Sequence, residues 1–455
     1  MKFKTTIILF SILIILLIFV FFFEVKEKKG EKEEKLVELS SNDVQKIIFK
    51  REDGTISFQK DEKGEWLISE PLEAAADKYE VDQLAGDFSD LRVERVVEEA
   101  PEDLSQYEIP KKEITLWYKE REKPVKILVG MENPLDRTFF AKREDEKRVV
   151  LIPSLLKSLL EKKILDFRKK DIFSFETDKV KNIKLRAKDS RWEAAKKEEE
   201  WWLSHPVKAI AQKSRVESIT GSLSRLKAKE FVSEEKNAEE LKKYGLDRPE
   251  YEITLGMPLE NKEIIFSLHK QEEKVYATSF LSTKIIEVDG SIIDDLGKKV
   301  EELREKEVVQ FNSWEASKVF LKKGELEIKV SKDKEDRWHF ETTGKEEADE
   351  SKVKTFIQKI ESLSAEEFID PPLDFKKYGL DRPQAEVTIW TKGDDEPEEK
   401  AKEFKVLIGS EDKEAKKVVV KNARLDYLFK VDSAFLGDIP REAKDWMKEK
   451  EKEKK

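Results

Sequence analysis

The stretch YGLDRPEYEITL, residues 244–255, predicts the end of a helix followed by a strand. Gly245 can adopt the left-handed conformation that follows many helices, which costs other residues a clash of their Cβ atom. Pro249 stops the helix and favours extended backbone before it, and the alternating EITL then predicts a strand. The same word, YGLDRP, returns at residues 378–383 before a similar strand, EVTI.

The apolar residues around each glycine fit a Schellman motif, the helix ending in which two backbone hydrogen bonds close the last turn. Leu241 with Leu246, and Phe375 with Leu380, occupy the two positions that make its hydrophobic contact. Lysines fill the last helical turn before each glycine, where cations favour the helix dipole.

A first copy of the word, LSQYEIP at residues 104–110, lacks the glycine, the Asp and the Arg. A binding motif would be lost there, whereas a helix stop would only be weakened, so we interpret YGLDRP as structural. The alternative is that two exposed charged pairs contact a partner: Asp247 with Arg248, and Asp381 with Arg382.

The repeated word belongs to a chain of three similar modules. Trp66, Trp202 and Trp338 lie 136 residues apart, each after a charged run. A helix with an apolar stripe at i, i+3, i+7 and i+10 follows in each copy. The stripes are Val81, Leu84, Phe88 and Leu91; Val216, Ile219, Leu223 and Leu226; and Val353, Phe356, Ile360 and Leu363. Asp77 and Asp349 stand where they can cap the first and third helices, whereas Gln212 is a poorer cap.

Alternating strands surround each helix, including EITLWY, EITLGM and EVTIWT, and a charged hairpin precedes each tryptophan. We therefore predict an α+β fold class: one N-terminal transmembrane helix followed by three tandem α+β repeat modules with antiparallel sheets. The modules are placed at residues 43–175, 176–311 and 312–447, before a charged tail at residues 448–455.

The N-terminus predicts a membrane anchor. After a short tail at residues 1–4, residues 5–23 carry no charge and are long enough to cross most of a bilayer of ~30 Å. No small-residue cleavage pattern follows, so we expect an uncleaved signal anchor and a charged linker at residues 24–42, with a cleaved signal peptide as the alternative. Lysines flank both sides of the anchor, but long domains translocate largely regardless of charge. We expect a single-pass membrane protein whose body is extracytoplasmic.

Composition and motifs narrow the function classes. With 99 acidic and 89 basic residues the net charge is -10, which gives no general attraction for nucleic acid. The absence of cysteine excludes disulfides, thiolate metal sites and a cysteine nucleophile. His205, His269 and His339 lie at non-equivalent places without metal-ligand spacing, and no nucleotide or hydrolase fingerprint occurs. We expect no enzyme, no cofactor, no metal and no small-molecule ligand.

The doubled tryptophan suggests a second function. Trp201 and Trp202 must point to opposite faces of their strand. We expect Trp202 to be the core anchor and Trp201 to be exposed and available to a partner. An alternative function is therefore a module protein that binds an envelope polymer such as a glycan.

Together these features resemble the bacterial domain-of-unknown-function family 4340. The resemblance rests on the N-terminal anchor, the W-x-[LF] strand, the helix after it, and YGL-x-x-P followed by E-[IV]-T-[LI]; it covers nearly all of residues 43–447. It implies no catalytic residue, and proteins of this family look like companions of gliding-type ABC transporter components. We therefore expect a non-enzymatic, membrane-anchored accessory or scaffold protein of the bacterial cell envelope, with ABC transporter subunits as partners.

Overall fold

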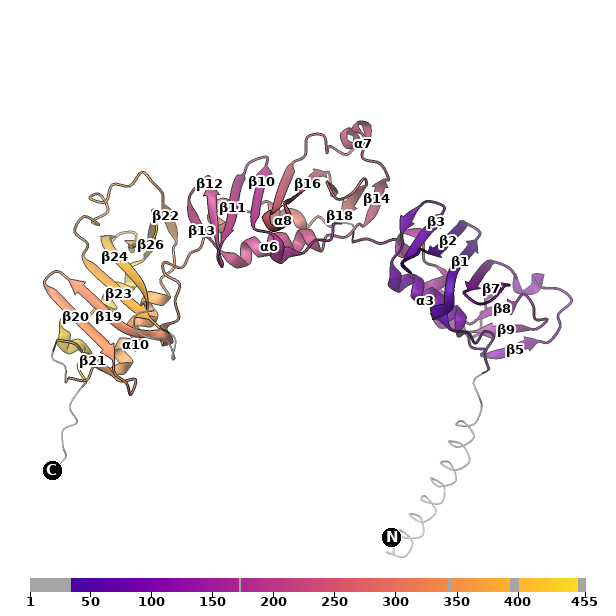
Figure 1. Cartoon of the computed structure of the whole chain (residues 1–455), viewed down its shortest axis with the longest axis horizontal. Coiled ribbons are helices and arrows are strands. Elements are labelled where there is room, and N and C mark those ends of the chain that lie inside the picture. Colours follow the sequence, from indigo (N-terminus) through magenta and orange to yellow (C-terminus); the bar gives the residue numbers. More distant parts are fainter. Residues whose placement is uncertain (1–33, 172, 343–345, 393–400, 449–455) are drawn as a thin grey trace, which may run out of the picture. The chain divides into compact units, whose positions relative to one another are not determined.

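The computed structural model describes residues 34–171, 173–342, 346–392 and 401–448 (Figure 1). They form two compact units, Met1–Lys170 and Asp171–Lys455. Unit 1 contains a nine-stranded sheet, and unit 2 contains a nine-stranded and an eight-stranded sheet. All strand pairings in these sheets are antiparallel. The prediction of three repeat modules with antiparallel sheets is confirmed.

The membrane anchor expected at residues 5–23 lies outside the described residues, as do the tail at residues 1–4 and nearly all of the charged tail at residues 448–455. Within the described part of the chain, no helix combines the length and the apolar character needed to cross a membrane.

The sheet of module 1 has the strand order β4-β3-β2-β1-β6-β7-β8-β9-β5. Its strands are β1 Val44–Arg51, β2 Gly54–Lys60, β3 Trp66–Glu70, β4 Ala74–Ala75, β5 Arg95–Glu98, β6 Lys112–Tyr118, β7 Val125–Glu132, β8 Phe139–Arg143 and β9 Val149–Ile152. Its helices are α3 Lys78–Ser89, α4 Lys157–Leu160 and α5 Ile164–Phe167.

Module 2 repeats this order as β13-β12-β11-β10-β15-β16-β17-β18-β14. Its strands are β10 Asn182–Ala187, β11 Arg191–Lys197, β12 Glu200–His205, β13 Ala209–Ala211, β14 Glu230–Ser233, β15 Tyr251–Met257, β16 Lys262–Gln271, β17 Lys274–Ser279 and β18 Ile285–Val288. Its helices are α6 Lys213–Ser224, α7 Ala238–Lys243, α8 Ile292–Leu296 and α9 Val300–Leu303.

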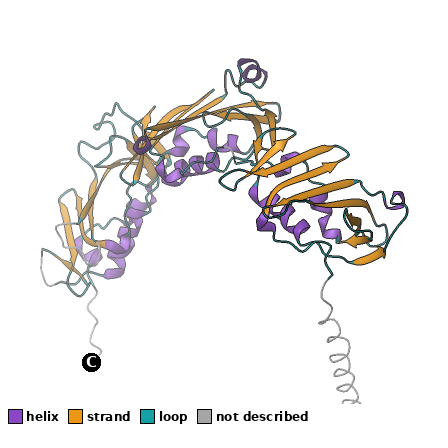
Figure 2. Cartoon of the chain, turned by 45° about the vertical axis from the view of Figure 1, so that its right-hand side comes forward, coloured by secondary structure: helices purple, strands orange, loops and turns teal. Residues whose placement is uncertain are grey.

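Module 3 has the order β21-β20-β19-β23-β24-β25-β26-β22. Its strands are β19 Ala316–Lys323, β20 Leu326–Lys332, β21 Trp338–Phe340, β22 Glu367–Ile369, β23 Ala385–Thr391, β24 Lys402–Asp412, β25 Lys417–Asn422 and β26 Leu428–Asp432, and its helix is α10 Glu350–Glu361. In every module the long helix, α3, α6 or α10, lies on one face of the sheet, whereas α7 of module 2 lies apart from α6 and α8 (Figure 1 and Figure 2).

The long helix of each module forms where the apolar stripe predicts it. All of the predicted stripe residues are buried, at 7% exposure or less. The last residue of each stripe, Leu91, Leu226 or Leu363, lies two residues past the end of its helix, so each helix is shorter than predicted. The Asp77 side chain accepts hydrogen bonds from the backbone of α3, and Asp349 does the same for α10. Gln212 makes no such bond to α6, as its poorer capping ability predicts. These helices cover the sheet through the predicted faces.

The YGLDRP word forms the predicted Schellman turn in both copies. Gly245 and Gly379 have φ angles of 70° and 66°. Leu246 N donates to Leu241 O at 2.7 Å, and the corresponding bond from Leu380 N to Phe375 O is 2.8 Å. In module 1 the same turn forms with Glu108 in the left-handed conformation, at φ 50°. The predicted turn geometry is therefore confirmed in both copies. The predicted helix precedes it only in module 2, as α7, because residues 375–379 of module 3 form turns.

In modules 1 and 3 the turn also builds a small second core on the sheet face opposite the long helix. Leu380 packs with Val419 and Leu428 there. The neighbours of Val419 along β25, Val418 and Val420, belong to the main core instead. Because successive residues of a strand point to opposite faces, the two cores lie on the two sides of one sheet.

Module 1 begins earlier than predicted. Leu36 and Val37 are 0% and 2% exposed and belong to its core. Leu36 N donates to Leu91 O at 2.7 Å, directly after α3. The linker expected at residues 24–42 is therefore wrong from residue 34 onward: two apolar residues among many charges are enough to fix this segment. Likewise, unit 2 begins at Asp171 rather than at residue 176.

Candidate functional site

Trp201 is buried, and the expectation that it is exposed is wrong. It is 2% exposed, whereas Trp202 is half-buried and its Nε1 donates to Glu200 at 3.2 Å. In every module the core tryptophan pairs across the sheet with a lysine of the preceding strand: Trp66 with Lys60, Trp201 with Lys196, and Trp338 with Lys332. Trp201 is thus the counterpart of Trp66 and Trp338, and it carries no partner contact.

The spacing of the helices contains the signal for the correct register. Val81, Val216 and Val353 are 135 and 137 residues apart, and so are Trp66, Trp201 and Trp338. An even spacing of 136 residues instead selects Trp202, one place too far along an alternating strand.

The charged pairs of the YGLDRP words are exposed. Asp247 with Arg248, and Asp381 with Arg382, follow the two Schellman turns and face solvent. They belong to different modules and form no common cluster by any contact recorded among the described residues. Their contact with a partner stays a prediction.

An exposed apolar surface distinguishes module 2. Ile265, Phe280 and Leu281, which we call the apolar patch, are 40%, 76% and 36% exposed. Phe280 N donates to Ile265 O at 2.9 Å, which places Phe280, directly after β17, beside Ile265 of β16. Ile264 and Phe266 on either side of Ile265 are 0% exposed in the core, so Ile265 lies on the face opposite the helices.

The same positions in modules 1 and 3 are mostly polar. Glu144 N donates to Lys126 O, and Ala423 N to Lys405 O, in the same 2.9 Å backbone bond as Phe280 and Ile265. Lys126 Nζ lies 2.9 Å from the Glu144 carboxylate, and Lys405 Nζ lies 2.8 Å from Glu386. Module 2 therefore replaces solvated ion pairs with exposed apolar side chains. Sequence spacing could not single out this patch, because Lys126, Ile265 and Lys405 lie at different distances from their core tryptophans. The shared backbone bond identifies them as equivalent.

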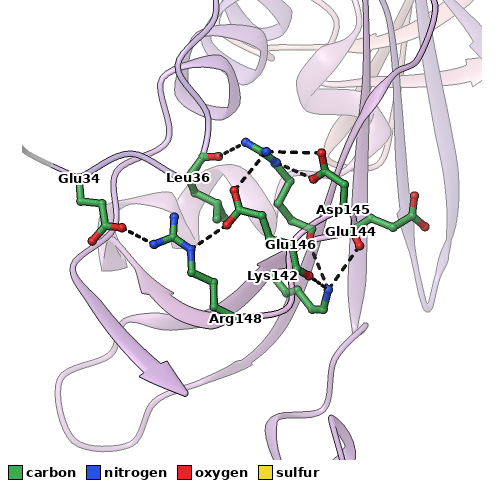
Figure 3. Close-up of polar contacts among 8 residues, drawn as sticks. Glu34, Leu36, Lys142, Glu144, Asp145, Glu146 and Arg148 are labelled. Atoms are coloured by element: carbon green, nitrogen blue, oxygen red, sulfur yellow. Dashed lines mark hydrogen bonds and ion pairs between the residues drawn. The ribbon is translucent and has the colours of Figure 1, made fainter. Parts of the chain in front are cut away.

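A charged network, which we call the clamp, holds the segment before β1 onto module 1 (Figure 3). Arg143, at the end of β8, donates from Nη1 to Leu36 O at 2.9 Å. The same guanidinium pairs with Asp145 at 2.6 Å and with Glu146 at 3.2 Å. The ion pair with Arg143 lowers the pKa of Asp145.

The clamp also includes Arg148 and Lys142 (Figure 3). Arg148 pairs with Glu146 at 2.7 Å and with Glu34, and these hydrogen bonds raise its pKa. Lys142 donates to the carbonyl oxygens of the turn between β8 and β9, including that of Glu146. Module 3 has a similar bond, because Asn422 Nδ2 donates to Val308 O at 2.8 Å. The chain entering both modules is thus fixed by side chains of the equivalent hairpin.

The described residues contain no group of three or more His, Asp or Glu side chains arranged to hold a metal ion. His339 Nε2 lies 2.8 Å from Asp333, and the ring of His269 packs beside Gly245. His205 ends β12. The three histidines stand in separate places, as their non-equivalent positions predict.

Comparison with known families matches three overlapping segments of the chain, residues 66–209, 201–373 and 338–453, to one family. The chain belongs to the family described as Domain of unknown function (DUF4340). Each matched segment of this DUF4340 protein begins at the core tryptophan of a module: Trp66, Trp201 and Trp338. This agrees with the strand register in selecting Trp201 as the repeated residue.

A search of curated proteins gave no match. Among solved structures, a DNA polymerase sliding clamp from Pseudomonas aeruginosa with ligand aligns over 87% of this chain and 93% of that one, at 7% identity and a TM-score of 0.16. The DNA polymerase III subunit beta from Pseudomonas aeruginosa aligns over 86% and 93%, at 8% identity and a TM-score of 0.14. Similarity this low carries no argument about fold or function.

Proposed function

We propose that this DUF4340 protein is a non-enzymatic, membrane-anchored accessory protein that presents its modules to a protein partner. The partner we propose is a membrane subunit of an ABC transporter. The anchor is residues 5–23, and the body lies on the extracytoplasmic side. The observation that carries the interaction role is the apolar patch of module 2.

An exposed cluster of this kind is unfavourable in an isolated soluble module. Burying one large apolar side chain such as Phe280 against a partner contributes about 1.5–3 kcal/mol. Interface centres are enriched in aromatic residues and depleted in charge, whereas the ion pairs at the equivalent positions of modules 1 and 3 suit solvent. Module 2 is therefore the module best suited to bind a protein surface.

The clamp supports the anchored arrangement. It fixes residues 34–37 to module 1, which shortens the proposed linker after the anchor to residues 24–33. A short spacer restricts how far module 1 can move from the anchor. A scaffold that acts at a fixed distance from the membrane gains from such a restriction.

Affinity purification from gently solubilised membranes tests this proposal. The full chain is compared with a version that starts at Glu34, which keeps the clamp intact. We expect transporter subunits to be recovered with the full chain. If they are also recovered with the version that lacks the anchor, the modules are the part that recognises them. Phe280→Asp should lower recovery at least tenfold, because it puts an unpaired charge at the interface centre.

Leu259→Asp is the matched control, because Leu259 is 86% exposed in the same module but lies outside the apolar patch. It should leave recovery unchanged. A photo-crosslinking residue in place of Phe280 should then label the partner directly. Recovery of the full chain alone would remove the transporter proposal, and equal recovery with Phe280→Asp would remove the apolar patch from it.

A further inference from the structure

In module 1 a carboxylate accepts the hydrogen bond of the core tryptophan's indole N–H. Trp66 Nε1 donates to Asp82 of α3 at 2.8 Å, and Lys78 Nζ donates to the other carboxylate oxygen at 2.6 Å. Lys60 Nζ lies 4.8 Å from the centre of the Trp66 ring. Burial opposes the ionised form of Asp82, but hydrogen bonds from Lys78 and Trp66 outweigh it and lower the pKa. Module 1 therefore contains a built carboxylate site between an indole N–H and two ammonium groups.

Module 3 has the same indole and lysine but no carboxylate. Its α10 carries Lys354 at the position of Asp82, one residue after the first stripe residue in both helices. Trp338 is 2% exposed, and its buried Nε1 has no hydrogen-bond partner among the described residues. Lys332 Nζ lies 5.7 Å from the centre of the Trp338 ring. A buried donor without an acceptor is unfavourable, so an acceptor that reaches Trp338 Nε1 relieves this cost.

The unpaired indole borders a groove of about 310 Å³. Lys332, Lys354 and Gln358 line it together with Ser313 and Trp314. Trp314 is 65% exposed and offers the face of its indole ring. The groove thus combines one open aromatic surface, two cations, and amide and hydroxyl groups that can pair with ligand hydroxyls.

The two lysines at the mouth of the groove each form an ion pair with an exposed carboxylate. Lys332 pairs with Asp336 at 3.0 Å, and the Asp336 side chain is 79% exposed. Lys354 is itself 52% exposed and pairs with Glu350, one turn earlier on α10. The Lys354–Glu350 pair is exposed on both sides and contributes little to stability, and the Asp336 partner of Lys332 is itself exposed. A ligand carboxylate can therefore replace both acidic partners. Lys354 must swing aside to admit the ligand, and its exposure permits this.

We propose that module 3 binds the carboxylate of an acidic sugar in this groove. The carboxylate takes the place that Asp82 fills in module 1, accepting from Trp338 Nε1 and pairing with Lys332 and Lys354. The sugar ring packs its apolar face on Trp314, and Gln358 and Ser313 pair with its hydroxyls. This site needs neither the membrane nor the protein partner, so it stands apart from the proposed function.

Fluorine NMR of the full chain labelled with 5-fluorotryptophan tests the site. Trp338→Phe and Trp314→Phe assign the two signals. D-glucuronate should shift both signals in a saturable way, whereas acetate should bind at least tenfold more weakly and D-glucose weaker still. Loss of both shifts up to high millimolar glucuronate overturns the proposal. Equal binding of acetate overturns the sugar assignment, and equal binding of glucose overturns the role of the carboxylate.

Lys354→Asp is the most specific test, because it gives α10 an aspartate at the position where Asp82 of α3 accepts from Trp66 in module 1. The introduced carboxylate should accept from Trp338 and lower glucuronate affinity at least tenfold while the melting temperature stays the same or rises. Lys352→Asp, on the same helix but outside the groove, makes the same change of charge and should keep full affinity. Unchanged affinity in Lys354→Asp would show that the ligand does not occupy this site.

Discussion

Two features disfavour any side chain at Gly245: its left-handed backbone and the close approach of a neighbouring residue. Its φ is 70°, and a Cβ atom there would lie 2.3 Å from Cδ2 of His269. At Gly379 the φ is similar, but the nearest atom would be Ser410 N at 3.0 Å. Modules 1 and 3 carry glycine, Gly130 and Gly409, where module 2 carries His269 on its strand. Of the two YGLDRP turns, only that of module 2 packs its glycine against an aromatic ring.

Gly245→Ala should therefore destabilise unit 2 more than Gly379→Ala. The left-handed conformation costs alanine about 1–2 kcal/mol in both, and the His269 clash adds roughly 1–3 kcal/mol to the first. Urea unfolding of the two variants measures the difference. Adding His269→Ala to Gly245→Ala should recover most of the excess, and purely additive effects in this double-mutant cycle would contradict the contact.

The residues of these turns could be predicted because the motif is local. Glycine, a flanking apolar pair and a following proline fix a helix end without help from the rest of the chain. Trp201 could not be placed in the same way, because its burial depends on which face of β12 meets the helix. A shift of one residue exchanges the two faces of a strand, so only the spacing relative to α6 decides it.

Among the elements, the end of α9 shows how modules 2 and 3 join within unit 2. Arg304 is 2% exposed, and its guanidinium lies 3.9 Å from the ring centre of Phe368 and 4.6 Å from that of Tyr427. Its Nη1 pairs with Asp370 at 2.9 Å. The Tyr427 hydroxyl in turn accepts from Ile210 N at 3.4 Å, so a residue of module 3 contacts the edge strand of module 2.

Tyr427 gives this junction a pH dependence. Burial raises the pKa of Tyr427 to about 12, whereas an unfolded tyrosine ionises near pH 10. The unfolded state therefore releases this proton first, and unit 2 loses stability as the pH rises between these values, by about 1.4 kcal/mol per pH unit. Tyr427→Phe removes this group, so its unfolding free energy should fall less between pH 9 and pH 11 than that of the wild type.

Lysines also titrate in this range, and the comparison with Tyr427→Phe cancels their contribution. Urea unfolding at the two pH values measures the effect. A difference between wild type and variant that does not change with pH would mean that Tyr427 ionises equally in both states. None of this follows from sequence patterns, because Arg304, Phe368 and Tyr427 are far apart in the chain and meet only through packing.

At the scale of the whole molecule, three repeats form two main cores in the part of the chain that the structure describes. One core contains residues of module 1 alone, from Leu36 to Phe167, and the other is continuous from Phe173 to Trp446 through modules 2 and 3. The repeat count could be predicted from the spacing of tryptophans and helix stripes. The merging of two modules could not, because buried linker residues such as Val308 and Val309 look like an ordinary charged connection in sequence.

We therefore expect two unfolding transitions rather than the three that independent modules would give. Modules that share a core unfold together, since loss of one exposes the apolar face of the other. Asp82→Ala removes the acceptor of Trp66 in module 1. It should lower the unfolding free energy of only one transition, by about 1–3 kcal/mol. Arg304→Ala leaves Asp370 without its partner at the junction and should lower only the other. Calorimetry of the full chain and these variants measures both, and a third transition that Arg304→Ala leaves in place would show that modules 2 and 3 unfold separately.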